Sequence, residues 1–175
     1  MRHIAFLRAI NVGPHVVKMD RLRKIFEAMA FTHVETFIAS GNVIFDSPSS
    51  DRAALEARIE RDLKKALGYD VGTFIRSCPE VSAIAARDPF DGPTDCSLYV
   101  VFLKTAADRA LRKRLAELCS DTDAFQAHKR ELYWQSHNGI SQSAAAIPFG
   151  KAFATGGTMR NVTTVRKLAA KYGSR

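Results

Sequence analysis

The order of strands and helices along the chain constrains the fold more than any other feature of the sequence. Residues 1–87 follow the order strand, helix, strand, strand, helix, strand, which is typical of the split βαβ, or ferredoxin-like, unit. In the second helix, leucine or isoleucine recurs every four residues, and a glycine follows at its end. The predicted segments are 3–9, 19–30, 34–38, 43–46, 52–67 and 71–75.

A stretch rich in acids, proline and glycine at 88–95 interrupts this order, and a similar order then begins again. The interruption follows a short predicted helix at 79–87. After it come predicted strands at 98–103, 124–128 and 131–135 and helices at 106–119 and 161–172, with 145–153 left unassigned. The sequence therefore predicts an α+β fold of two ferredoxin-like halves, 1–87 and 96–175. Residues 88–95 connect them, and a basic helix forms the C-terminal part.

The positive charge is unevenly distributed along the chain. Residues 1–131 contain 20 Lys and Arg against 18 Asp and Glu, whereas residues 132–175 contain six Lys and Arg and no acid. A local excess of this kind favours a polyanion or a phosphate group as partner, so nucleic acid and phosphorylated small molecules are the candidate ligands. The alternative is a solvated basic tail that only improves solubility.

Several classes of protein do not fit the sequence. The longest apolar runs, such as 98–103, are too short to span a bilayer, and the N-terminal residues lack a signal-peptide pattern. We therefore expect a cytoplasmic protein without a membrane partner. The three cysteines lack a Cys-x-x-Cys pair, which argues against a disulfide framework and a zinc site. No metal or cofactor is expected, and the pattern leaves the oligomeric state open.

Two polar stretches in the first half are candidates for ligand contact, because each lies where a predicted strand ends. Arg8 and Asn11 follow the first strand, and Ser40 and Asn42 lie in the turn of the first hairpin. Arginine offers five donors and asparagine both a donor and an acceptor, a set suited to a carboxylate, a phosphate or a base edge. The alternative is turn chemistry, since asparagine beside glycine is common in hairpins without any ligand.

A third candidate is the glycine-containing stretch 155–161, which runs into the last predicted helix. Free backbone N–H groups at a helix N-terminus can hold an anion, and Arg160, Asn161 and Lys167 would add donors and charge. The stretch lacks the Gly-Lys-Ser/Thr ending of a P-loop, which excludes a Walker-type site. It is alternatively a flexible connector in which Thr158 or Asn161 caps the helix.

These stretches also carry a family resemblance. Residues 7–13, Lys18-Met19 with Leu22, and 37–45, followed by 160–165 with Lys167-Leu168, resemble the signature of the family called domain of unknown function 1697. The chain differs at Ala9, Pro14, Phe37 and Val162, where glycine, glycine, tyrosine and tryptophan are expected. The resemblance implies a bacterial α+β protein with two ferredoxin-like halves, includes Lys18 among the motif residues, and implies no activity.

Catalytic patterns are sparse, and three functions remain open. The sequence has neither a Gly-x-Ser-x-Gly elbow nor a His-Glu-x-x-His motif, and only His15, near Asn11, is a candidate base. The first hypothesis is binding of an anionic ligand, either nucleic acid or nucleotide-like. Base stacking on Phe6 and Phe45 is one version, with burial in the core as its alternative. The others are an enzyme for a small phosphorylated or carboxylated metabolite and a protein–protein interaction module.

Overall fold

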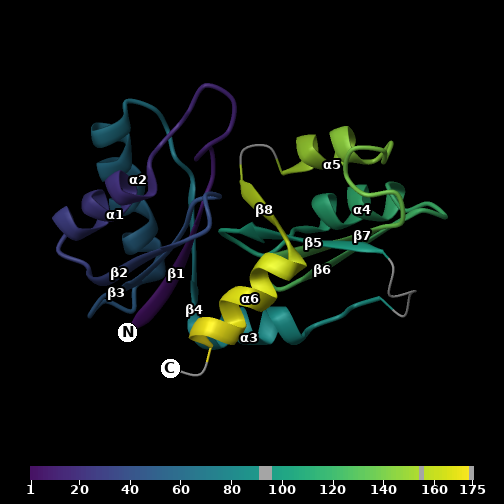
Figure 1. Ribbon diagram of the computed structural model, residues 1–175. Coiled ribbons are helices and arrows are strands. Elements are labelled where there is room, and N and C mark those ends of the chain that lie inside the picture. The colour runs from purple at the N-terminus through teal and green to yellow at the C-terminus, as the bar shows by residue number, and fades with distance from the viewer. Residues whose placement is uncertain (91–95, 154–155, 174–175) are drawn as a thin grey trace. The chain divides into compact units, whose positions relative to one another are not determined.

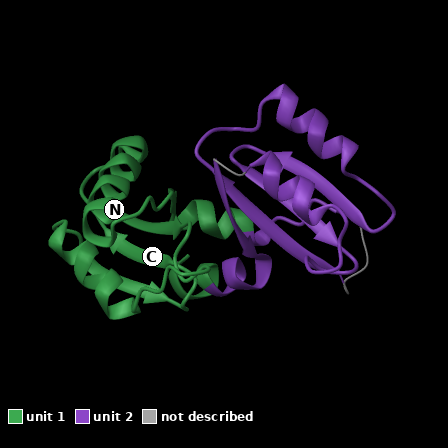
Figure 2. Cartoon of the chain, turned by 90° about the horizontal axis from the view of Figure 1, so that it is seen from above, with its two compact units in different colours: residues 1–84, 168–175 green, residues 85–167 purple. Residues whose placement is uncertain are grey.

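The computed structural model describes residues 1–90, 96–153 and 156–173 (Figure 1). The chain forms two compact units, which Figure 2 shows in different colours. Unit 1 comprises residues 1–84 together with 168–175, and unit 2 comprises residues 85–167. Within the described ranges, no helix combines the length and the apolar character that crossing a membrane requires. The first three residues of the predicted connector, 88–90, are described, whereas 91–95 lie outside the described residues.

Unit 1 is a four-stranded antiparallel sheet with two helices. Its elements are β1 (Arg2–Leu7), α1 (Met19–Ala28), β2 (Thr32–Phe37), β3 (Asn42–Asp46), α2 (Arg52–Leu67) and β4 (Thr73–Ser77). The strands lie in the order β2-β3-β1-β4, so the first strand is central, flanked by β3 and β4. Asp51 starts α2 by accepting a hydrogen bond from the Ala54 N–H (3.0 Å), and Gly68 ends it in the left-handed region with φ 83°.

The core of unit 1 lies between one face of this sheet and the helices α1 and α2. Leu22 and Phe26 of α1 and Ile59 of α2 pack in one cluster with Phe45 of β3, and all four are fully buried. Phe6 of β1 is also fully buried, although it belongs to the opposite face of the strand. The alternative of core burial for Phe6 and Phe45 is therefore confirmed, and stacking of bases on exposed rings has no support here.

Unit 2 repeats the order of elements and the order of strands. Its elements are β5 (Ser97–Leu103), α4 (Arg109–Glu117), β6 (Asp123–His128), β7 (Glu131–Ser136), α5 (Ala146–Ala152) and β8 (Gly157–Asn161). The strand order β6-β7-β5-β8 is that of unit 1, position for position. Phe125, Trp134 and Phe149 form the aromatic centre of its core. The predicted α+β fold with two similar halves is thus what the structure has.

One prediction for the C-terminal part is wrong. The stretch expected to be a glycine loop feeding a helix contains a strand, β8, whose residues Gly157–Asn161 pair with Leu103–Tyr99 of β5. Gly157 is required by close packing, because a Cβ at this position would lie 2.8 Å from Val101. Residue 155, where the predicted loop begins, lies outside the described residues. The anion loop at a helix N-terminus is therefore absent from the described part of this stretch.

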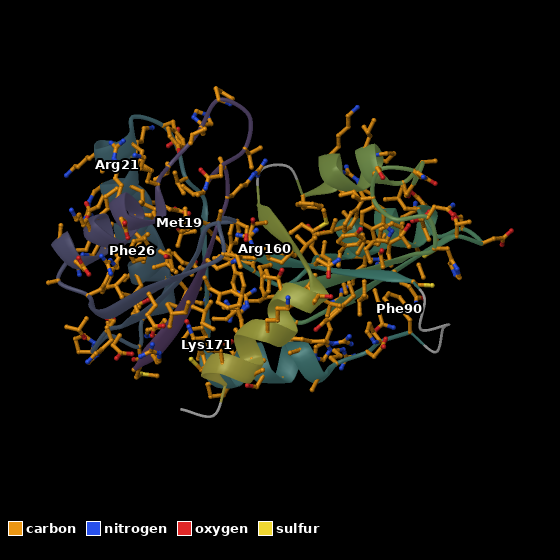
Figure 3. The ribbon with its side chains drawn as sticks, in the orientation of Figure 1. Met19, Arg21, Phe26, Phe90, Arg160 and Lys171 are labelled. Atoms are coloured by element: carbon orange, nitrogen blue, oxygen red, sulfur yellow. The ribbon has the colours of Figure 1, made fainter. Side chains whose placement is uncertain are left out.

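Two further helices, α3 (Cys78–Ala86) and α6 (Val162–Tyr172), contain the boundaries between the units. The C-terminal end of α6 belongs to unit 1, where it is bound to the edge strand β2. The Tyr172 hydroxyl donates a hydrogen bond to Glu35 Oε2 (2.9 Å), and the Arg2 guanidinium contacts Glu35 Oε1 at 2.6 Å. The same guanidinium lies 5.5 Å from the centre of the Tyr172 ring. Lys171 also reaches Glu35, at 3.4 Å (Figure 3).

Candidate functional site

The loops after β1 and β2, together with the first residue of β3, contain five of the predicted ligand residues. Asn11 holds these loops together: its Nδ2 donates to the Ala39 carbonyl (2.8 Å) and its Oδ1 accepts from the Val17 N–H (2.7 Å). Its backbone lies in the left-handed region at φ 55°, which asparagine tolerates better than most residues. The side-chain amide of Asn11 thus stabilises the loop. Lys18 lies at the end of this loop, directly before α1, and is exposed.

The hairpin turn uses its polar groups in the same way. Asn42 is fully buried, and its Nδ2 donates to the Phe37 carbonyl (3.1 Å) and to Ser40 Oγ (2.9 Å). Gly41 takes φ 71°, and a Cβ there would lie 3.0 Å from Ile10 Cβ. Turn chemistry therefore accounts for the sequence at 40–42. The structure brings Asn11 next to this turn, while the neighbouring Arg8 keeps a half-buried side chain.

His15, the candidate base, lies in the same unit and stacks on Tyr69 with ring centres 3.8 Å apart and planes inclined by 21°. The structure therefore shows a packing role for this ring. Among the described residues, no group of three or more His, Cys, Asp or Glu side chains could hold a metal ion.

The remaining predicted residues lie at the end of β8 and on α6. Arg160 is nine per cent exposed, and its Nη1 donates to Thr158 Oγ1 (2.9 Å) and to the Met159 carbonyl (2.8 Å) (Figure 3). Burial lowers the pKa of its guanidinium to about 10. The Oδ1 of Asn161 accepts from the Thr163 N–H (2.8 Å) and so caps α6. Of these three residues, only Asn161 and Lys167 are exposed.

Unit 2 contains a cavity of about 320 Å³. It is lined by residues from the end of β5, the start of α4 and the end of α5. Four alanines leave the space open, and Leu103 and Phe153 form its apolar walls. The lining residues are Leu103, Thr105, Ala106, Ala107, Asp108, Ala110, Leu111, Arg114, Ala152, Phe153 and Gly156.

The charges around this cavity are mainly positive. Asp108 is its one lining carboxylate, and that group already accepts the Leu111 N–H (2.7 Å) as the cap of α4. Arg114 is the one cation among the described residues that line the cavity. Around it, residues 104–114 contain five basic side chains against one acidic side chain: Lys104, Arg109, Arg112, Lys113 and Arg114 against Asp108. Sequence reasoning missed this site, although the basic cluster beside alanines was the signal available.

Comparisons with known proteins place the chain in a family. A family model described as "Protein of unknown function (DUF1697)" matches residues 1–133. The chain belongs to the DUF1697 family. A solved structure, described as that of the conserved bacterial protein SP0830 from Streptococcus pneumoniae, is 21% identical and superposes with a TM-score of 0.78 over 97% of each chain. At this identity the likeness concerns the fold alone. No curated protein matches the chain.

The DUF1697 match covers one side of the cavity and leaves the other side outside it. Leu103 and the lining residues of α4, including Arg114, fall within residues 1–133. Ala152, Phe153 and Gly156 lie beyond the matched range. Eight of the eleven lining residues of the cavity in this DUF1697 protein thus lie within the family match.

Proposed function

We propose that this protein binds a small anionic molecule in the cavity beside α4 of unit 2. The anionic group faces Arg114, and an apolar or aromatic portion lies against Leu103 and Phe153. The cavity itself supports the proposal, because its volume of about 320 Å³ lies at the lower end of the range of small-molecule pockets. A nucleoside monophosphate, a sugar phosphate and a small aromatic carboxylate all have the required chemistry.

The charge of the ligand follows from the groups around the cavity. A guanidinium presents several donors to a phosphate or carboxylate, often in pairs. The neighbouring cations of α4 raise the local positive potential, which increases the concentration of anions at the site. Asp108 offsets one of these charges, which leaves five basic side chains against one acidic side chain over residues 104–114.

The same observations favour a small ligand over a nucleic-acid strand. A strand is bound by a row of exposed cations along a groove. Arg160 is instead buried in β8, and Lys171 is paired with Glu35. The side-chain amide oxygens of Asn11 and Asn161 accept hydrogen bonds from backbone N–H groups of the protein itself. The predicted basic residues that remain exposed, Lys18 and Lys167, belong to different units.

A thermal-shift screen tests the proposal. The panel contains nucleoside monophosphates, sugar phosphates and small aromatic carboxylates, with the uncharged nucleosides and sugars as matched controls. A ligand present at one hundred times its Kd stabilises the folded protein by about 2.7 kcal/mol, which raises the Tm by about 5–10 °C. We expect a saturable rise with at least one anion and none with its uncharged counterpart.

Variants tie the effect to the cavity. Arg114→Ala removes the lining cation and Ala110→Leu fills space beside it, so both abolish the rise in Tm. Arg166→Ala is the control, because this exposed arginine of α6 belongs to unit 2 and does not line the cavity. No shift with any anion, or a shift that survives both cavity variants, refutes the proposal. Tight, salt-dependent binding of single-stranded oligonucleotides with no small-molecule effect would favour the nucleic-acid hypothesis instead.

A further inference from the structure

A cysteine and a histidine that are 41 residues apart in the sequence come into contact in unit 2. The Cys96 Sγ and the His137 Nδ1 are 3.4 Å apart, which is hydrogen-bond distance for sulfur. The contact follows from strand register: Ser97 of β5 is paired with Ser136 of β7, and the two residues flank this pair. The backbone of His137 is fixed as well, since its N–H donates to the Thr122 carbonyl (2.9 Å).

The other two cysteines have different surroundings. Cys78 is one per cent exposed, and burial raises the pKa of its thiol. Cys119 is exposed just beyond α4, and its thiol donates to the Leu115 carbonyl (3.5 Å). Of the three described cysteines, only Cys96 is partly accessible and also in contact with a side chain that can accept its proton.

We propose that Cys96 is a reactive thiol that His137 activates, and that it forms a mixed disulfide with small disulfides. Nucleophile and base within hydrogen-bond reach are the signature of an activated thiol. The imidazole takes the proton of the thiol, and the resulting thiolate attacks one sulfur of a disulfide R–S–S–R. A Cys96–S–S–R bond forms, the original S–S bond breaks, and the released thiolate takes up the proton held by His137.

Among the described residues near the pair, Asp123 and Tyr99 have hydrogen-bond partners of their own. Asp121 and Asp123 flank Thr122 beside His137, and Tyr99 lies on β5. The Asp123 carboxylate accepts hydrogen bonds from Trp134 (2.7 Å) and Ser143 (2.9 Å), and Asp121 is exposed. The Tyr99 hydroxyl accepts the Ile140 N–H (3.3 Å). Cys96 precedes β5 and the cavity lies where β5 ends, so this site is separate from the proposed ligand site.

The test compares the three cysteines within one sample of the full chain. The protein reacts with 5,5′-dithiobis(2-nitrobenzoic acid) for set times, the reaction is quenched, and peptide mass spectrometry gives the rate at each cysteine. A thiol half ionised at pH 6.5 has about fifty times the thiolate of an ordinary thiol, and its lower nucleophilicity reduces the advantage to about fivefold. We therefore expect Cys96 to react about fivefold faster than Cys119 at pH 6.5, and Cys78 to stay unmodified.

The pH dependence of the rates and two variants distinguish activation of the Cys96 thiol from its mere exposure. At pH 9.5 ordinary thiols are mostly ionised, so the ratio of the Cys96 rate to the Cys119 rate there reports accessibility together with the intrinsic nucleophilicity of the two thiolates. The ratio should be about fiftyfold higher at pH 6.5 than at pH 9.5, because only the ionised fraction changes with pH, and His137→Gln should remove this difference without changing Cys119. His128→Gln, on β6 of the same unit, is the matched control. An equal ratio at both pH values, or an unchanged ratio in His137→Gln, overturns the proposal.

Discussion

The replacement of Asp123 by alanine gives the sharpest test of how unit 2 is held together. This carboxylate, at the start of β6, is four per cent exposed. It accepts hydrogen bonds from Trp134 Nε1 (2.7 Å), Ser143 Oγ (2.9 Å) and Thr122 Oγ1 (3.0 Å). One side chain thus joins the core tryptophan of β7 to the segment that leads into α5. We expect Asp123→Ala to destabilise unit 2 strongly.

The size of the effect follows from what the substitution leaves behind. The indole N–H of Trp134, on a side chain that is one per cent exposed, loses its partner, which costs about 1–3 kcal/mol. The hydrogen bonds from Ser143 and Thr122 add about 1 kcal/mol each, because those hydroxyls can turn to other partners. The expected loss in the free energy of unfolding is therefore about 3–5 kcal/mol.

Urea unfolding followed by tryptophan fluorescence measures this loss directly, since Trp134 is the only tryptophan in the chain. The midpoint should fall in Asp123→Ala while the slope stays near that of the wild type. Asp121→Ala is the control: this neighbouring carboxylate is exposed, and its loss should change stability by less than about 0.5 kcal/mol. If the two variants lose the same stability, the hydrogen-bond argument is wrong.

Three further predictions concern acid stability, a turn and a helix end. Burial by itself would raise the pKa of Asp123, but the hydrogen bonds, that from Trp134 foremost, hold it below its ordinary value. Its contribution is therefore present above about pH 4 and lost as the pH falls through the folded-state pKa, so Asp123→Asn should flatten the acid limb of urea midpoints measured from pH 5 to 2. Gly41→Ala should cost about 1–3 kcal/mol in thermal unfolding, and clearly more than Gly13→Ala, which has a similar φ of 58° but no atom within 4 Å of the added Cβ. Glu35→Gln should speed amide exchange at the end of α6 with a loss of only about 0.5–1 kcal/mol, because the carboxylate is 41% exposed; unchanged exchange there would contradict the bond to Tyr172.

Periodicity was enough to predict most of the fold. The helix expected at 52–67 has those bounds, because its apolar stripe, its N-terminal cap and its terminal glycine all agree. The strand β8 was missed because Gly157 resembles a loop residue. A glycine is needed there because a side chain would collide with Val101 on the neighbouring strand. This is a tertiary requirement, which a local sequence pattern does not reveal.

The sites were harder to predict for a related reason. Polar residues at strand ends were predicted to bind a ligand. Asn42 instead stabilises a turn and Asn161 caps a helix, which are common structural roles of asparagine. The cavity is lined by Leu103, Arg114 and Phe153, which come from separate segments of the chain. Its alanines do not reveal in the sequence that they border a cavity. Likewise, Cys96 and His137 become neighbours only through the register of two strands.

The course of α6 has a consequence for how the protein is made. Residues 1–84 leave the ribosome early, but the residues that complete their unit, from Leu168 onward, are synthesised after all of unit 2. Until then the surface that receives Tyr172, which is one per cent exposed in the finished fold, stays open to water. The unit that is translated first is therefore completed last, by a helical segment that is synthesised after unit 2.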